Sequence, residues 1–235
     1  MTTFGLVHGA GHGAWCWERL IPELAARGHR AVAVELPGED PAAGCARYAE
    51  IVDATLPPAD DLVLVGHSLG GLTVPLVAAR RPARTLVFLC ALIPVPGQSL
   101  EEQLAADPGI YAPGYTARPG RVVHPDGSIA WADEASAREA FYHDCTSADV
   151  RWAFARLRRQ AAAPRTERCP LAGWPTARSV YVLGREDRAV NPQWSRRAAR
   201  ERLGVEAFEL PGGHSPFLAR PAALAALLDA VAGGG

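Results

Sequence analysis

The chain has 235 residues, is 49% hydrophobic and 21% charged, and carries a formal net charge of −1. These values are typical of a globular protein with one sizeable core. The balanced charge gives no electrostatic basis for binding nucleic acid or an anionic membrane, so we expect neither as a partner. No apolar run reaches the length of a bilayer span, and no signal-peptide pattern opens the chain, which predicts a cytoplasmic protein.

Cysteine and lysine usage narrows the chemistry further. The 5 cysteines form no Cys-x-x-Cys pair, which indicates reduced thiols and neither a disulfide framework nor a zinc site. We therefore predict no bound metal. All 24 basic residues are arginines, so the chain has no lysine amine for Schiff-base catalysis.

Strand-like and helix-like segments alternate along the first 93 residues, which predicts parallel strands joined by crossover helices. The predicted strands are Phe4–Val7, Ala31–Val34, Leu62–Val65 and Thr85–Leu89. The predicted helices between them are Trp15–Arg27, Ala42–Thr55 and Leu69–Arg80, each closed by glycine or proline.

The alternation stops between residues 94 and 176, where proline, glycine and aromatic residues are frequent. We interpret this segment as a mainly helical cap inserted after the fourth strand. The alternation then resumes with predicted strands at Arg178–Leu183 and Val205–Leu210 and predicted helices at Pro192–Leu203 and Phe217–Val231. The predicted fold class is thus α/β, with a mostly parallel six-stranded sheet formed by residues 1–93 and 177–235 and flanked by helices.

Ser68 lies in the most informative motif, Gly66-His-Ser-Leu-Gly70, between a buried strand and a helix. The two glycines allow the tight turn that exposes a nucleophilic serine above a sheet. The motif alone is also compatible with an ordinary glycine-rich turn, because a serine hydroxyl needs a base before it can act as a nucleophile.

Partners for Ser68 occur after two later strands, where functional groups of such sheets collect. Asp187 follows the strand ending at Leu183, and His214 follows the strand ending at Leu210. The order serine, aspartate, histidine is that of the α/β-hydrolase triad. We predict Ser68 as nucleophile, His214 as general base and Asp187 as the residue that orients it, with the backbone N–H groups of Ala10 and Leu69 as oxyanion donors.

Each predicted triad partner also has a structural alternative. Asp187 can serve as a turn-capping carboxylate, and the neighbouring Glu186 competes for the same role. His214 can be a loop histidine bonded to backbone groups. His8, His12 and His67 crowd the same region, and we interpret them as structural hydrogen-bonding residues.

The motifs resemble those of the plant methylesterase and hydroxynitrile lyase family of α/β-hydrolases and its bacterial relatives. The resemblance rests on the opening segment Val7–Trp17, on Gly66–Gly71, on Glu186-Asp187 and Gly213-His214, and on the cap motif Phe141–Cys145. It implies a helical cap over the pocket, no cofactor, oxyanion donors at Ala10 and Leu69, and Asp187 as the triad acid.

The same resemblance separates two chemistries. Hydroxynitrile lyases of the family commonly have threonine where this chain has Gly9, and lysine where it has Ser215. Both lyase features are absent, and the small Gly9 is expected to leave room for an ester carbonyl. An esterase is therefore the favoured prediction.

The leading hypothesis is a serine hydrolase that cleaves a small, hydrophobic or aromatic carboxylic ester through an acyl-enzyme. For the pocket we predict Gly9, His12, Trp131 and Trp152 as substrate-binding residues, although the tryptophans can equally form the core of the cap. The alternatives are a thioesterase or biosynthetic cyclase or lyase with the same triad, and a non-catalytic ligand receptor. The sequence leaves the oligomeric state open, with a homodimer as one alternative.

Overall fold

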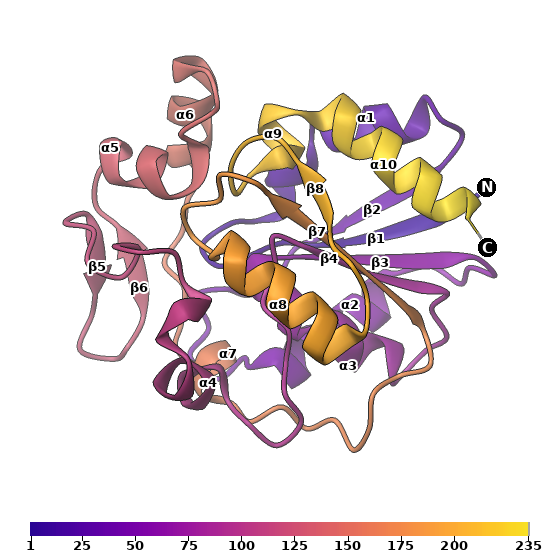
Figure 1. Ribbon diagram of the computed structural model, residues 1–235, viewed down its shortest axis with the longest axis horizontal. Helices are drawn as coiled ribbons and strands as arrows, with labels where there is room; N and C mark the ends of the chain where they lie inside the picture. Colours follow the sequence, from indigo (N-terminus) through magenta and orange to yellow (C-terminus); the bar gives the residue numbers. More distant parts are fainter. Residues whose placement is uncertain (235) are drawn as a thin grey trace.

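A computed structural model describes residues 1–234 as a parallel sheet covered by helices on both faces and extended on one side by a long insertion (Figure 1). The sheet has six strands in the order β2-β1-β3-β4-β7-β8, and every neighbouring pair is parallel. The strands are β1 (Thr3–Val7), β2 (Arg30–Val34), β3 (Leu62–His67), β4 (Thr85–Leu89), β7 (Arg178–Gly184) and β8 (Phe208–Leu210). The predicted fold class is confirmed.

Side chains of the central strands alternate between two cores, as expected for a sheet covered on both faces. Leu64 and Phe88 pack into one core, and Val63 and Val87 pack into the other. The first core contains α2 (Cys45–Thr55), α3 (Val74–Ala78) and α8 (Pro192–Leu203), and the second contains α1 (Leu20–Ala25) and α10 (Pro221–Gly233). Figure 1 shows these two helical layers on opposite sides of the sheet.

The insertion between β4 and β7 lies beyond the C-terminal ends of the strands (Figure 1). It contains α4 (Leu100–Ala106), η3 (Pro108–Ile110), the antiparallel strands β5 (Arg121–Val123) and β6 (Ile129–Trp131), α5 (Glu134–Ala137), the π-helix η4 (Arg138–Tyr142), α6 (Ser147–Phe154) and α7 (Ala163–Thr166). The hairpin was not predicted, because two strands of three residues carry too little pattern to stand out. We propose residues 94–176 as the cap.

Two predicted helices are divided in the structure. The segment Trp15–Arg27 forms the 3-10 turn η1 (Ala14–Trp17) followed by α1, and Leu69–Arg80 forms the 3-10 turn η2 (Ser68–Leu72) followed by α3. In the second case Pro75 stands in the first turn of α3, where its missing N–H is tolerated, so a new helix begins there.

The C-terminal segments also differ in extent from their predictions. The predicted strand Val205–Leu210 is shorter, because the Val205 N–H bonds to Ala199 O and closes α8 beyond Gly204, a residue in the left-handed conformation. The predicted helix Phe217–Val231 is divided into the short α9 (Pro216–Ala219) and α10.

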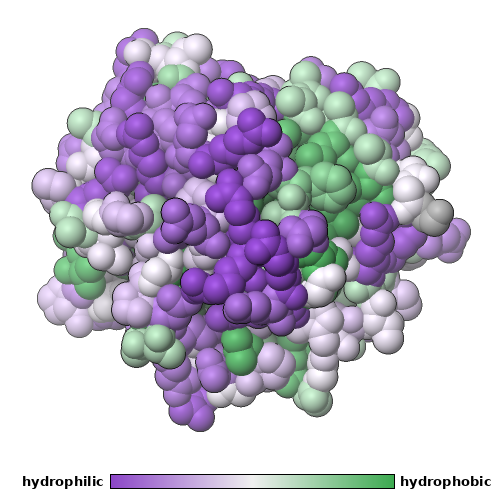
Figure 2. All heavy atoms as spheres, in the orientation of Figure 1, coloured by the Kyte–Doolittle hydropathy of each residue, from purple (hydrophilic) through white to green (hydrophobic). Residues whose placement is uncertain are grey.

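The face of the molecule seen in Figure 2 is mainly hydrophilic, with a hydrophobic area where α10 lies. The outward face of this helix carries alanines, including Ala222, Ala223 and Ala226. No helix in residues 1–234 is both long enough and apolar enough to cross a bilayer.

Candidate active site

Ser68 stands at a sharp turn between β3 and η2. Its backbone has φ of 51°, a left-handed conformation that a residue with a side chain rarely adopts. Glycines make the turn possible, because a Cβ on Gly66 would lie 2.7 Å from Gly70 O and a Cβ on Gly70 would lie 2.6 Å from Val7 O. The side chain is only partly buried, and Ser68 lines a cavity below the cap. The strained turn is typical of an exposed nucleophile.

Asp187 and His214 form a buried hydrogen-bonded pair. His214 Nδ1 lies 2.8 Å from Asp187 Oδ2, and these residues are only 1% and 5% exposed. The other carboxylate oxygen, Oδ1, accepts the backbone N–H groups of Ala189 at 2.7 Å and Val190 at 3.0 Å. With both oxygens engaged, the carboxylate orients the imidazole so that Nε2 can accept a proton. The rival Glu186 is exposed, and its carboxylate forms no ion pair within residues 1–234.

The loop that carries His214 is fixed near Ser68 by two contacts. His67, which directly precedes Ser68, donates Nε2–H to His214 O at 2.9 Å, and the two imidazole rings lie 4.6 Å apart. From the cap, Asp144 accepts the N–H of Gly213 at 3.0 Å and also pairs with Arg220. No hydrogen bond joins Ser68 to His214 among the described residues, a looseness common in active sites without substrate.

Ala10 and Leu69 both line the cavity beside Ser68. Within residues 1–234 neither backbone N–H donates to a protein acceptor, whereas the N–H groups of neighbouring residues such as Gly11 and His12 do. Two uncommitted donors beside Ser68 are the arrangement that an oxyanion requires.

His12 supports the Ala10 loop from behind and does not line the cavity. Burial lowers its pKa to about 3, so the ring is neutral, and Nδ1–H donates to Ala10 O at 2.9 Å. Its Nε2 is then the acceptor for the Tyr142 hydroxyl at 2.7 Å. His12 was predicted to bind substrate, but the structure gives it the structural, hydrogen-bonding role that was also predicted for it.

Three buried neutral imidazoles should make folding sensitive to acid. Burial lowers the pKa of His8 to about 4 and of His12 to about 3, and it holds that of His67 well below 6.5. Below pH 6.5 the unfolded chain binds protons that the folded chain does not, so stability is lost as pH falls from about 6.5 towards 4. The free energy of unfolding should fall by about 4 kcal/mol per pH unit at the steepest point, or about 1.4 for each imidazole.

Urea unfolding at pH 7, 6 and 5 measures this slope. In His12→Gln, which retains a donor and an acceptor but cannot titrate, the slope should decrease by about a third. A free energy of unfolding that stays constant over this range would show that the three rings take up protons in the folded protein as readily as in the unfolded chain.

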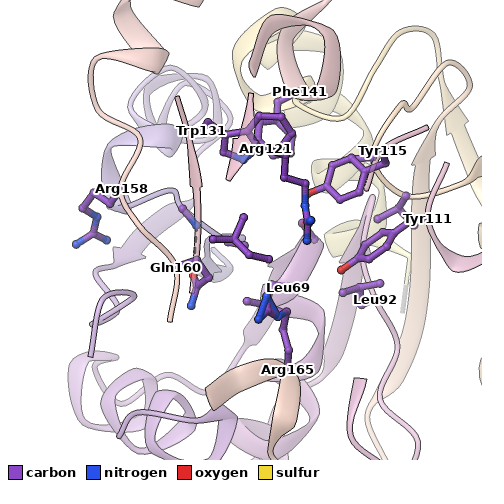
Figure 3. A pocket seen from close by; sticks show the side chains of 16 residues that line it. Leu69, Leu92, Tyr111, Tyr115, Arg121, Trp131, Phe141, Arg158, Gln160 and Arg165 are labelled. Carbon is purple, nitrogen blue, oxygen red and sulfur yellow. Dashed lines mark hydrogen bonds between the residues drawn. The ribbon is translucent and has the colours of Figure 1, made fainter. Parts of the chain in front are cut away.

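The cavity beside Ser68 combines aromatic with cationic side chains (Figure 3). Besides Ala10, Ser68 and Leu69 it is lined by Gly11, Leu92, Tyr111, Tyr115, Arg121, Ile129, Trp131, Phe141, Arg158, Gln160, Arg165, Ala189 and Val190. Of the predicted substrate-binding residues, Trp131 lines it. Trp152 does not, because its ring packs against Trp15 at 5.2 Å and beneath Arg156 at 4.6 Å.

Gly9 lies where two segments of the chain pack closely together. A Cβ at this position would lie 2.8 Å from Ser68 Cβ and 2.9 Å from His67 Nδ1. The missing side chain therefore lets the loop after β1 pack against the turn at Ser68.

Several cavity residues were missed by sequence reasoning. Phe141 lies 5.6 Å from the His214 ring, and its position in the cap motif was a usable signal. Arg121 and Arg165 carried no signal, because they come from cap elements 44 residues apart and resemble any other arginine in the sequence.

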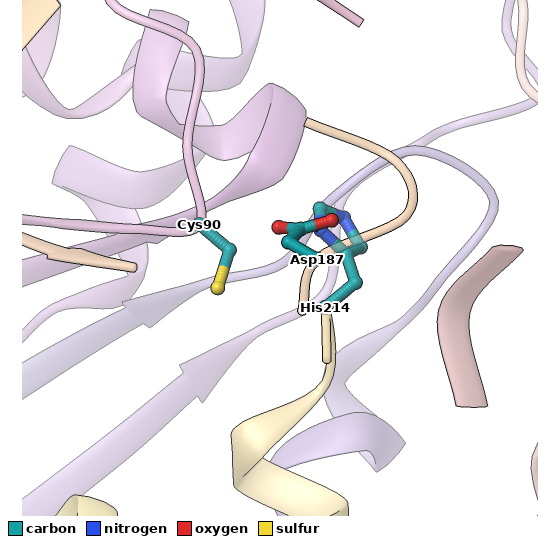
Figure 4. Close-up of side chains that lie close together, drawn as sticks. All are labelled: Cys90, Asp187 and His214. Atoms are coloured by element: carbon teal, nitrogen blue, oxygen red, sulfur yellow. The ribbon is translucent and has the colours of Figure 1, made fainter. Parts of the chain in front are cut away.

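Cys90 lies next to Asp187, on the side away from His214 (Figure 4). The three side chains offer ligand atoms within 4.8 Å of one another, a spacing that would allow all three to bind one metal ion. Burial raises the pKa of the Cys90 thiol well above its usual value, and the nearby Asp187 carboxylate raises it further, whereas a metal requires the thiolate. Both Asp187 oxygens are also engaged in hydrogen bonds. The protonated Cys90 thiol and the hydrogen-bonded Asp187 carboxylate therefore do not fit a metal site.

The family model described as the alpha/beta hydrolase family matches residues 6–227. The chain belongs to this family. Alpha-hydroxynitrile lyase of Arabidopsis thaliana is 30% identical over 253 residues, covering 97% of this chain and 96% of that protein. A putative chloroplastic methylesterase 14 of Arabidopsis thaliana is 25% identical over 249 residues, covering 97% and 71%. The predicted resemblance to plant methylesterases and hydroxynitrile lyases is confirmed.

A solved structure of polyneuridine aldehyde esterase is similar over the whole hydrolase fold. The TM-score is 0.82 at 23% identity, and the alignment covers 98% of this chain and 99% of that chain. At this identity the likeness shows the fold alone. Because one relative of this α/β-hydrolase is named as chloroplastic, the cytoplasmic location stays a prediction.

Proposed function

We propose that this α/β-hydrolase is a serine esterase that cleaves a small carboxylic ester through an acyl-enzyme. The observation that carries the proposal is the buried Asp187–His214 hydrogen bond of 2.8 Å, held beside a serine with φ of 51°. A histidine oriented by a carboxylate next to an exposed serine is the arrangement that activates a hydroxyl at neutral pH.

The reaction proceeds in two halves. Ser68 Oγ attacks the carbonyl carbon while its proton passes to His214 Nε2, and the carbonyl oxygen takes up the negative charge between the N–H groups of Ala10 and Leu69. The intermediate collapses, the C–O bond to the alcohol breaks, and His214 returns the proton to the leaving oxygen. Water then attacks the acyl-enzyme and gives a proton to His214, which passes it to Ser68 Oγ as the acyl–oxygen bond breaks and the acid leaves.

Two features support hydrolysis over cyanohydrin cleavage. Ser215, at the position where the family resemblance implies lysine in lyases, is fully buried. The chain has no lysine, so no amine is available there to stabilise a departing cyanide. A thioesterase would use the same groups and is separated from an esterase only by substrate.

A panel of 4-nitrophenyl acetate, butyrate and benzoate, set beside thioesters of the same acids, tests the proposal. We expect turnover of the oxygen esters with saturation kinetics and an initial burst where deacylation is slow. A strong preference for the thioesters would assign a thioesterase instead. No turnover of any member by folded protein would contradict the proposal.

A further inference from the structure

The cavity that Ser68 lines also receives two guanidinium groups from the cap. Arg121 comes from β5 and Arg165 from α7, and Figure 3 shows their side chains entering the cavity from opposite sides. The third arginine of the lining, Arg158, points away from the cavity in the same view and pairs with Glu35. Only Arg121 and Arg165 therefore present charge to a bound molecule.

The two guanidinium groups have little counter-charge: Arg165 has one distant carboxylate partner, and Arg121 lies 5.8 Å from the Tyr115 ring and has no carboxylate partner among the described residues. The Arg165 side chain is 10% exposed, its hydrogen bond goes to Gly127 O, and the nearest carboxylate is that of Glu101, at 3.9 Å and 54% exposed. Arg121 has no ion pair within residues 1–234, and its Nε is buried without a hydrogen-bond partner. Arg165 is buried and Arg121 is partly buried, and removing a cation from water with so little counter-charge is costly, which makes this pair unusual for a purely structural role.

The surroundings reinforce the positive potential. No aspartate or glutamate belongs to the cavity lining, and Figure 3 shows the hydroxyls of Tyr111 and Tyr115 turned towards the interior. Burial lowers the pKa of Arg165; the Glu101 carboxylate partly offsets this effect, and the like charge of Arg121 adds to it. An anion placed between the two groups would relieve both the burial cost and the repulsion.

The position of the pair suggests which part of a substrate it meets. Arg121, Arg165, Tyr111 and Ile129 line the inner cavity and also an adjoining, more open hollow on its outer side. The guanidinium groups thus lie between Ser68 and the outside, within reach of the end of an acyl chain whose carbonyl is at Ser68.

We propose that Arg121 and Arg165 bind an anionic group, a carboxylate or a phosphate, at the far end of the acyl group. The planar, forked guanidinium binds either oxyanion through paired N–H donors. The protein would then prefer monoesters of dicarboxylic or phosphono-carboxylic acids, which changes the sequence-based expectation of a purely hydrophobic acyl group. The inference rests on the proposed esterase function.

The test compares esters that differ only in terminal charge: 4-nitrophenyl valerate, 4-nitrophenyl hydrogen glutarate and 4-nitrophenyl 4-phosphonobutyrate. We expect kcat/KM for an anionic ester to exceed that for valerate by about 10- to 100-fold, the effect of a hydrogen bond to a charged group. Whichever anionic ester is preferred identifies the oxyanion. A ratio at or below one in the wild type would overturn the proposal.

Substitution of each arginine tests whether it causes the preference for the anionic ester. Arg121→Gln and Arg165→Gln should each lower the anionic-to-neutral ratio about tenfold or more. Arg151→Gln is the matched control, because Arg151 is exposed on α6 and forms no ion pair in the described chain. Because the readout is a ratio of two substrates on one sample, a partly unfolded variant does not mimic the result. An unchanged ratio in both variants would overturn the proposal.

The anion site can also be tested if the protein proves not to be an esterase. If no ester is hydrolysed, calorimetry with glutarate and with inorganic phosphate tests the anion site directly. Binding to the wild type that weakens about tenfold or more in Arg121→Gln would support the site without the reaction. No binding, or equal binding to both proteins, would overturn it.

Discussion

Ser68→Ala is expected to lower kcat for 4-nitrophenyl ester hydrolysis by about 10⁵- to 10⁶-fold, to the level supported by the oxyanion donors and binding alone. The side chain removed is the proposed nucleophile and is the one serine, threonine or cysteine among the residues that line the cavity, and its φ of 51° shows that the backbone holds it in a costly conformation. Alanine fits the same space, so the fold and the cavity should persist.

Steady-state kinetics and circular dichroism of the purified variant check both points. Ser147→Ala is the matched control, because Ser147 is exposed on α6 and bonds only to Arg138 through its side chain. The control should hydrolyse esters at the wild-type rate. Substantial hydrolysis by folded Ser68→Ala would exclude Ser68 as the nucleophile.

Asp187→Asn is expected to lower kcat by about 10⁴-fold, because the substitution selects the wrong imidazole tautomer. The backbone N–H groups of Ala189 and Val190 require an acceptor, so the asparagine carbonyl should occupy the place of Oδ1. Its NH₂ group would then face His214 Nδ1. That nitrogen must accept, Nε2 must carry the proton, and the base for Ser68 is lost.

Glu186→Gln is the control for this prediction, because it removes the neighbouring carboxylate that competed for the same role in the sequence. Its side chain is exposed and forms no ion pair among the described residues, so its kcat should stay within about twofold of wild type. Measurement of kcat for both variants on the same ester shows which of the two carboxylates, Asp187 or Glu186, supports hydrolysis. A large loss in Glu186→Gln with full activity in Asp187→Asn would reverse the assignment.

The sequence predicted well those features that depend on local pattern. Buried runs such as Leu62–Val65 located the strands, and the glycines around Ser68 predicted a turn whose crowding the backbone distances explain. The strand ends then placed Asp187 and His214 on the same edge of the sheet, because parallel strands share one carboxyl end. The structure brings these two residues together, and their catalytic roles stay a proposal.

The features that escaped prediction depend on contacts between distant segments. Arg121 and Arg165 share a cavity only because β5 and α7 fold over the strand ends, and a segment with weak periodicity gives no sign of that arrangement. The close packing at Gly9 escaped prediction for a related reason. The atoms that exclude a side chain there belong to His67 and Ser68, nearly 60 positions away in the chain.

Covalent labelling with a fluorophosphonate tests most directly whether the Asp187–His214 pair activates Ser68. We expect one adduct per molecule, found by mass spectrometry on the peptide that contains Ser68, forming slowly in His214→Ala and absent in Ser68→Ala. An unmodified Ser68 in folded wild-type protein, or a label on another residue, would contradict the assignment and favour a ligand receptor on a hydrolase fold.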